Sequence, residues 1–316
     1  NKKTRKSKKQ LKVILKDLDV DRDLVKNILC YQSSSSTFTS LRLAKQVAEI
    51  ARKTGAKFVV TTYEGHAWER LVYYYVRKVN PHVKCFGYQH AAVFESQHAI
   101  KRSLGEMYDP DVVFSSGLIS KDILNKNGFK GSKLVCLGSP KYSEVNMKKI
   151  NSQSCLVVPE GFISECLILF KLSLDYAKQY TEQFFVWRLH PSISFKELQK
   201  HSTIFKDIPN NITLSKDGLD DDIQKCDSVL YRGSTAVVNA VSAGLKPIYY
   251  QRSTETINID PIYTCQLGKF SVSNQEGLMV ALNMVVDIKT KQALQNFAQD
   301  FYTPIDVGAF LRETER

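Results

Sequence analysis

The sequence lacks any apolar run long enough to cross a membrane. Runs such as CLILF, residues 166–170, fall far short of the ~20 residues that a membrane-spanning helix needs. No signal peptide is recognisable either, so we expect a cytoplasmic protein. Because the first residue is Asn1 rather than methionine, we expect the sequence to start inside a longer chain.

The motifs of several common enzyme classes are also missing. The sequence has neither GxGxxG nor GxxxxGK[ST], which argues against nicotinamide-dependent and P-loop chemistry. The serine-hydrolase motif GxSxG is absent. No strand carries a DxD motif and no metal-ligand spacing is present, so we expect neither a metal nor another cofactor. The acidic run 220–222 opens a predicted helix, where carboxylates stabilise the helix dipole.

Cysteine is scattered, and no CxxC pair is present to suggest a zinc site. The odd number and the apolar surroundings predict free, buried thiols in a reducing compartment. The seven cysteines are Cys30, Cys85, Cys136, Cys155, Cys166, Cys226 and Cys265.

Positive charge is in excess, with a formal net charge of +12, and much of it lies in residues 2–16. Such a run is commonly a solvated tail or helix face, and it can also contact anionic lipid or nucleic acid. The sequence shows no RNA-binding signature and no recognition-helix pattern, so no nucleic-acid partner is expected. Anionic substrates and an anionic membrane surface remain as explanations, and we expect peripheral contact with the inner membrane.

Two domains are predicted, because 316 residues exceed what one hydrophobic core usually serves. Short apolar strands alternate with amphipathic helices in both halves, which predicts an α/β protein with parallel sheets. The predicted strands are 57–63, 83–90, 111–117, 133–142, 155–161, 183–191, 212–218, 227–233 and 246–250, and the predicted helices are 41–55, 67–80, 120–128, 164–180, 219–226 and 234–244.

The polar stretch 143–154 interrupts this alternation and predicts a linker. We therefore expect domains at 1–150 and 151–316 with a cleft between them. Residues 300–313 are expected to form a final helix that packs back on the first domain.

Polar residues follow several predicted strands directly, at the edge where ligands of such folds bind. In the second half these are Glu160 and Gly161 after one strand, and Arg188, His190 and Pro191 after the next. Arginine and histidine at a strand end suit an anionic ligand, and the proline ends the strand.

The sequence RGST at 232–235 follows a third strand of the second half. Gly233 permits a tight turn, and Ser234 or Thr235 is a natural helix N-cap. A helix N-terminus with two hydroxyl groups also suits a phosphate. The plain N-cap and the phosphate site both fit, and the neighbouring Arg188 and His190 favour the phosphate site.

In the first half, Glu64 lies between a predicted strand and a helix. It is either an acid that stabilises the helix N-terminus or a carboxylate that faces the cleft. In the second case it can pair with a histidine of the second half as base and acid. The expected acceptor-side residues are His66 and Glu69 beside it, and Gln89 and His90 after the next strand.

RLHPS at 188–192 and YRGSTA at 231–236 resemble the HP and Ser/Thr motifs of bacterial sialyltransferases and polysialyltransferases, and YEG at 63–65 resembles their acid motif. The architecture resembles GT-B glycosyltransferases. The longer stretch 62–142 resembles bacterial surface-carbohydrate biosynthesis proteins. The resemblance implies that Glu64 activates the acceptor hydroxyl, His190 assists departure of the nucleotide phosphate, and Ser234 and Thr235 hold that phosphate.

The resemblance thus implies metal-independent transfer of a sialic-acid-like or Kdo-like sugar from a CMP-activated donor to a glycan of capsule or lipopolysaccharide. PEG at 159–161 is a second match to the acid motif, which leaves Glu160 as an alternative to Glu64. Two other functions stay open: a CDP-glycerol-type polyol-phosphate transferase, and a non-catalytic module that binds glycan or nucleic acid.

Overall fold

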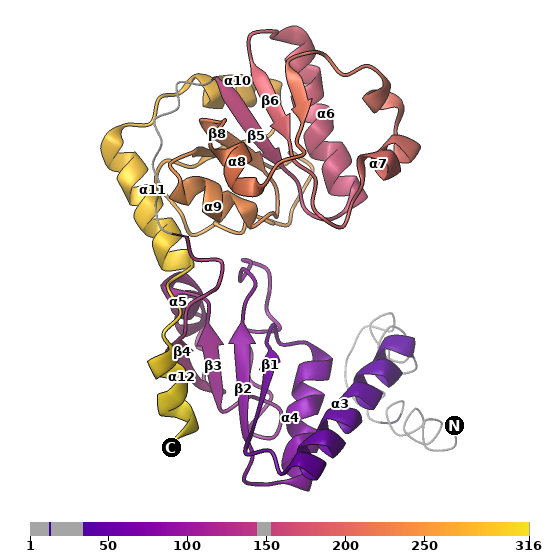
Figure 1. The fold of residues 1–316 in the computed structure, drawn as a ribbon, viewed down its shortest axis with the longest axis vertical. Coiled ribbons are helices and arrows are strands. Elements are labelled where there is room, and N and C mark those ends of the chain that lie inside the picture. The colour runs from indigo at the N-terminus through magenta and orange to yellow at the C-terminus, as the bar shows by residue number, and fades with distance from the viewer. Residues whose placement is uncertain (1–12, 14–33, 144–152, 316) are drawn as a thin grey trace. The chain divides into compact units, whose positions relative to one another are not determined.

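The computed structural model describes residues 13, 34–143 and 153–315 (Figure 1). The basic run 2–16, apart from Val13, lies outside the described residues, as do Cys30 and most of the predicted linker at 143–154. Both halves alternate helices and strands as the sequence predicts.

A four-stranded sheet with the order β1-β2-β3-β4 forms in the first half. Helix α3 (Ser35–Thr54) begins after the N-cap Ser34, whose hydroxyl accepts from the Thr37 N–H, and ends at Gly55, which has a φ of 62°. The elements of this half are α3 (Ser35–Thr54), β1 (Phe58–Thr62), α4 (Ala67–Val79), β2 (Lys84–Gln89), β3 (Val112–Ser115), α5 (Leu118–Lys126) and β4 (Lys133–Cys136).

A six-stranded sheet forms in the second half, with the order β10-β9-β8-β5-β6-β7 and parallel pairing throughout. Its elements are β5 (Ser154–Val158), α6 (Ile163–Gln179), β6 (Phe184–Trp187), α7 (Phe195–His201), the 3-10 helix η1 (Thr203–Lys206), β7 (Ile212–Leu214), α8 (Leu219–Ile223), β8 (Ser228–Tyr231), α9 (Ala236–Ser242), β9 (Lys246–Tyr250), β10 (Phe270–Val272), α10 (Gln275–Asn283) and α11 (Ile288–Phe301).

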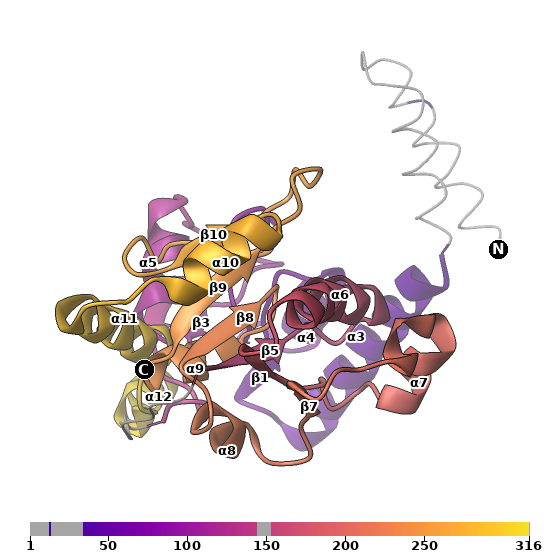
Figure 2. The ribbon, with the colours of Figure 1, turned by 90° about the horizontal axis from the view of Figure 1, so that it is seen from above.

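Helices cover both faces of this second sheet. Alternate residues of a strand point to opposite faces, so Cys155 and Val157 of β5 join one hydrophobic cluster and Leu156 and Val158 join the other. Figure 2 shows α6 and α10 on one side of the sheet and α8 and α9 on the other. Burial on both faces explains why β5 and β8 read as unbroken apolar runs.

The strand order of the second sheet reverses at β5. The chain passes from β5 outward through β6 to β7, then returns to pair β8 with the other side of β5. Such a reversal leaves a crevice at the carboxyl ends of the two strands beside it, because their crossover connections run in opposite directions. The fold therefore places the expected ligand site at the ends of β5 and β8.

The C-terminal segment contacts residues of the first half. The carbonyl of Thr303 accepts from the Ser139 N–H at 2.9 Å, and the rings of Phe114 and Phe310 lie 5.5 Å apart. Gly117 and Gly138 permit this approach, since a Cβ at either would collide with the carbonyl of Phe301 or Pro304.

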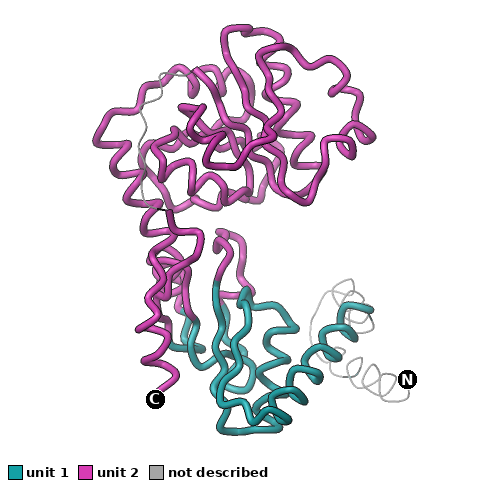
Figure 3. The backbone as a smooth tube through the Cα atoms, in the orientation of Figure 1, with its two compact units in different colours: residues 1–89, 102–113, 129–133 teal, residues 90–101, 114–128, 134–316 magenta. Residues whose placement is uncertain are grey.

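Two compact units result, one of residues 1–89, 102–113 and 129–133 and the other of 90–101, 114–128 and 134–316 (Figure 3). The domain boundary near residue 150 and the cleft stay predictions.

The final helix differs from the expected span 300–313. Helix α11 already ends at Phe301, and α12 (Val307–Thr314) begins only after an extended turn that contains Pro304. Proline has no N–H to continue a helix, and Asp306 caps the new helix by accepting from the Ala309 N–H. The prediction of one helix from residue 300 is therefore wrong.

The six cysteines that lie in the described part of the chain are free thiols, as predicted, and all but Cys136 are buried. No helix within the described residues is both long and apolar enough to span a bilayer.

Candidate functional site

The carboxyl ends of β5, β6 and β8 bring together three stretches that were predicted from the sequence to contact a ligand. They are Glu160 and Gly161 after β5, His190 after β6, and Gly233 after β8. Two glycines explain how side chains from different strands come so close at this edge.

Gly161 lies against the ring of His190. A Cβ at Gly161 would come within 2.8 Å of His190 Nδ1 and 3.1 Å of Ser192 Oγ. Real Cβ atoms do not approach side-chain atoms so closely, so any other residue at 161 would displace the imidazole. The structure thus joins the HP sequence to the end of β5.

The hydrogen bonds of His190 indicate which ring nitrogen carries the hydrogen. The backbone N–H of Ser192 donates to Nδ1 at 3.2 Å, and Ser192 Oγ lies 2.8 Å from the same atom. A backbone N–H can only donate, so Nδ1 is an acceptor, and the hydrogen of the neutral ring is on Nε2. Because the side chain is exposed, its Nε2–H can donate to a ligand oxygen.

Gly233 lies directly under the carboxyl group of Glu160. It has a φ of 50°, and a Cβ at this position would overlap the Glu160 carboxyl carbon. The sequence predicts Gly233 from the tight turn alone, and the structure adds a second requirement, the close approach of a side chain from β5.

Ser234 and Thr235 follow this turn with their hydroxyl groups uncommitted to the helix. Thr235 is at the N-cap position of α9, with φ −73° and ψ −5°, but its side chain makes no capping hydrogen bond. Thr235 therefore occupies the N-cap position without the capping hydrogen bond of a plain N-cap, and its contact with a phosphate stays a prediction. Both residues are half-buried, and their hydroxyls can bind a ligand.

Gly233→Ala is expected to lower stability by about 1–3 kcal/mol and to abolish the CMP binding that the sequence predicts, because the methyl group displaces Glu160. Thermal unfolding and CMP titration measure the two effects. Gly128→Ala is the matched control, since Gly128 has a φ of 70° with nothing within 4 Å of the added carbon. Equal loss of CMP affinity in both variants would contradict this assignment.

Arg232, also at the end of β8, is a residue whose role the sequence does not reveal. It is 2% exposed. Its guanidinium donates to Glu165 at 2.6 Å and to both carboxyl oxygens of Glu255 at 2.8 and 3.0 Å. Burial raises the pKa of Glu255, but hydrogen bonds from Arg232 and Arg252 outweigh burial and hold this pKa at about 2. Arg232 therefore ties α6 and the loop after β9 to the end of β8.

Arg188 makes contacts that compete with its expected role. Its Nη1 donates to Asp222 Oδ2 at 2.7 Å and to the carbonyl of Asp217 at 2.8 Å. Asp222 is 1% exposed, so it pairs with Arg188 rather than serving only the dipole of α8. The phosphate contact of Arg188 stays a prediction, as does that of Pro191, which is exposed beside His190.

In the first unit, Glu64 and His66 form a pair. Glu64 Oε2 lies 3.6 Å from His66 Nε2, and the two side chains are 27% and 56% exposed. Both are therefore open to a ligand. The structure describes Glu64 and His190 in separate units, so their cooperation stays a prediction.

Glu69 and Gln89 are too buried for the acceptor-side role expected of them, each being 1% exposed. The Glu69 carboxylate accepts from the backbone N–H groups of Glu64 and His66, at 3.0 and 2.7 Å. It shapes the loop that carries Glu64 and His66. The expectation for Glu69 and Gln89 is therefore wrong, whereas His90 is half-buried and stays a candidate.

A buried ion pair supports the same loop. Arg70 and Asp109 are in direct contact with side chains 3% and 0% exposed, and Arg70 Nε also donates to the carbonyl of Gly65 at 3.3 Å. Asp109→Asn is expected to lower the free energy of unfolding by about 3–5 kcal/mol, because it leaves a buried guanidinium unpaired.

Chemical denaturation measures this change in Asp109→Asn. Asp175→Asn is the control: Asp175 pairs with Lys171 on an exposed helix surface, where a pair contributes about 0–1 kcal/mol. Similar losses in both variants would be inconsistent with the assigned role of the buried pair.

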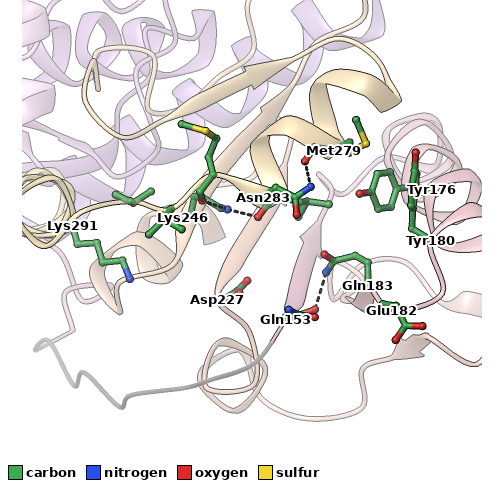
Figure 4. Close-up of a pocket in the computed structure, with 14 residues that line it drawn as sticks. Gln153, Tyr176, Tyr180, Glu182, Gln183, Asp227, Lys246, Met279, Asn283 and Lys291 are labelled. Atoms are coloured by element: carbon green, nitrogen blue, oxygen red, sulfur yellow. Dashed lines mark hydrogen bonds between the residues drawn. The ribbon is translucent and has the colours of Figure 1, made fainter.

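A cavity of about 460 Å³ lies at the opposite, amino-terminal edge of the second sheet (Figure 4). Gln153, Asp227 and Lys246, which line it, come at or just before the starts of β5, β8 and β9. Lys246 donates to the carbonyls of Leu282 and Met284 at 2.7 and 2.8 Å. Ligands of parallel sheets bind at the carboxyl edge, so we place the candidate site at His190 and not in this cavity.

No family model and no curated protein matches the sequence. Solved structures do match. The S. aureus MnaA–UDP co-structure is 14% identical with a TM-score of 0.53, over 87% of this chain and 77% of that one. Acinetobacter baumannii MurG is 11% identical with a TM-score of 0.54, over 89% and 78%. The calicheamicin glycosyltransferase CalG4 is 11% identical with a TM-score of 0.52, over 95% and 81%.

These likenesses concern the fold. Two parallel α/β sheets of four and six strands, matched along most of the chain, confirm the predicted fold class, an α/β protein with the GT-B fold.

Proposed function

We propose that the protein is a glycosyltransferase that moves a sugar from a nucleotide-activated donor to a glycan acceptor. The observation that carries this proposal is the gathering of His190, Gly161 and Gly233 at the strand reversal of the second sheet. There the His190 Nε2–H and the hydroxyls of Ser234 and Thr235 offer hydrogen-bond donors to a phosphate. Donors aimed at a leaving group that gains negative charge stabilise the transition state.

We propose CMP as the donor nucleotide, with a sialic-acid-like or Kdo-like sugar. The HP and Ser/Thr sequences support CMP, whereas the similar MnaA structure holds UDP. Thermal shifts with CMP, CDP, UDP and GDP test the choice: CMP should give the largest shift. A larger thermal shift with UDP than with CMP would identify UDP as the donor nucleotide. A largest shift with GDP would reject the proposal of a pyrimidine nucleotide.

Release of CMP from CMP-sugars in the presence of glycan acceptors tests the reaction itself. A product that retains the donor phosphate would instead identify a polyol-phosphate transferase. Bound nucleotide without any turnover would identify a binding module. We expect activity to persist in EDTA, and a requirement for added metal would contradict the proposed metal-independent mechanism.

The acceptor is proposed to be a glycan of capsule or lipopolysaccharide synthesis at the cytoplasmic face of the inner membrane. The supporting observation is the basic run 2–16, in which each charge near an anionic surface contributes about 1 kcal/mol. Binding to anionic vesicles should therefore weaken as salt is added. Salt-insensitive binding would count against this attachment.

A further inference from the structure

Glu160 is a half-buried carboxylate at the candidate phosphate site. Its carboxyl group lies over Gly233, at the turn that leads to Ser234 and Thr235. Within the described residues its side chain takes part in no hydrogen bond or ion pair. An anion bound to those hydroxyls would therefore lie close to a carboxyl group.

The nearest cation cannot neutralise Glu160. Arg232 is committed to Glu165 and Glu255, and Arg252 also pairs with Glu255 at 2.7 Å. This cluster therefore holds three carboxylates against two guanidinium groups, which leaves one negative charge uncompensated.

Four elements around Glu160 bring titratable or charged groups to this edge of the sheet. Helix α6 brings Glu165, the end of β8 brings Arg232, the loop after β9 brings Glu255, and the end of β6 brings His190 beside Gly161. Burial raises the pKa of Glu160, and Glu165 raises it further, while Arg232 opposes both. The surroundings therefore hold the pKa of this carboxyl above its ordinary value even before a ligand binds.

We propose that Glu160 takes up a proton from solvent when the donor phosphate binds and donates it in a hydrogen bond to a phosphate oxygen. This inference rests on the proposed function and adds a regulation to it. The protonated carboxyl removes the repulsion between two anions and supplies one more donor. Binding of the nucleotide is then linked to proton uptake.

The sign of the pH dependence follows from this linkage. Below the pKa of Glu160 in the free protein, the carboxyl already holds its proton and binding needs no uptake. Above that pKa, each pH unit weakens binding by up to about tenfold, because the proton must be taken from an increasingly dilute supply. Because burial raises the pKa of Glu160, affinity for the nucleotide is lost as pH rises through this raised pKa, which lies above the ordinary glutamate value of about 4.3.

Glu160→Gln separates this group from His190 and from the phosphate, which also titrate. Glutamine has the shape of the protonated carboxyl and donates a hydrogen bond at every pH. Titrations of the full chain with CMP and with UDP, from about pH 5 to about pH 8, should show that the variant binds like wild type in acid. At the alkaline end it should bind at least about tenfold more tightly than wild type, and the difference should grow by up to about tenfold for each pH unit above the pKa of Glu160.

Calorimetry in two buffers of different ionisation enthalpy counts the protons directly. Wild type should take up more protons per nucleotide than Glu160→Gln at the alkaline end. Glu182→Gln removes the same charge at an exposed position just before β6, at the opposite edge of the sheet, and should behave like wild type. A wild-type count of zero at every pH would overturn the inference without reference to any variant.

The outcomes distinguish this inference from the proposed function. Parallel pH profiles for wild type and Glu160→Gln, with binding intact, would reject the role of Glu160 alone. Failure of both CMP and UDP to bind at any pH would reject the pyrimidine-nucleotide donor and this inference with it.

Discussion

His190→Ala should lower turnover on the order of 10²–10³-fold and weaken the binding of CMP. The reason is geometric. Nδ1 accepts from the Ser192 N–H at 3.2 Å, which directs the Nε2–H outward as the donor. Alanine removes the proposed donor to the phosphate, which gains negative charge as the sugar leaves in the proposed reaction. Initial rates of CMP release and CMP titration measure the two effects.

Two further variants serve as controls for the effect of His190→Ala on turnover and CMP affinity. His201→Ala makes the same substitution at an exposed histidine of α7 and should leave both rate and affinity unchanged. Ser192→Ala keeps the imidazole and its backbone hydrogen bond, and removes only the Oγ contact of 2.8 Å, so it should have a smaller effect than His190→Ala. Unchanged CMP affinity in His190→Ala would show that the ring does not contact the phosphate.

The sequence alone predicts this edge of the sheet well, for a physical reason. Parallel strands end at a common edge, so residues such as His190 and Gly233 can be expected to meet although 43 positions separate them. The alternation of apolar strands and helices is a local signal, and every strand and helix predicted from it between residues 41 and 250 is present, whereas the predicted final helix over 300–313 is not. The elements α7, β10, α10 and α11 are present without having been predicted.

Contacts between side chains far apart in sequence could not be predicted in the same way. Arg188 is a plausible phosphate ligand until its partner Asp222 is known, and that partner lies on a helix after another strand. Arg232 likewise meets two carboxylates from α6 and the loop after β9. The residue type indicates that a cation is present, but only the packing of the elements determines which anion it meets.

The roles of residues close together in sequence could not be predicted either, as the acid motif around Glu64 shows. The stretch around Glu64 contains two glutamates within one turn of a helix start, and the sequence does not separate their roles. The structure does, because the Glu69 carboxylate accepts two backbone N–H groups while Glu64 is partly exposed. Burial holds the pKa of Glu69 above its ordinary value, although these hydrogen bonds oppose the shift.

Glu64→Gln is expected to lower turnover on the order of 10²–10⁴-fold while leaving CMP affinity unchanged. A sugar hydroxyl is a poor nucleophile at neutral pH, so transfer requires a base, and we propose that Glu64 is that base. Glutamine keeps the shape of the side chain but cannot accept the proton. The proposed CMP site lies wholly within the second unit, so its affinity should not respond. CMP release and CMP titration again measure both quantities, and Glu49→Gln, on the exposed surface of α3, is the control.

His66 is the alternative base. The contact between Glu64 and His66 allows substitutions to distinguish which of the two accepts the proton. Glu64 Oε2 lies 3.6 Å from His66 Nε2, so Glu64 can either take the acceptor proton itself or orient the imidazole that takes it. If Glu64 is the base, His66→Ala should reduce the rate less than Glu64→Gln does. If His66 is the base, the order reverses, and the turnover of Glu64→Gln should stay within a few-fold of wild type.

Glu69 no longer competes for the role of base, because its carboxylate accepts hydrogen bonds from the backbone of the same loop. Glu160 then remains as the last alternative, and a Glu160→Gln variant that keeps full turnover would exclude it.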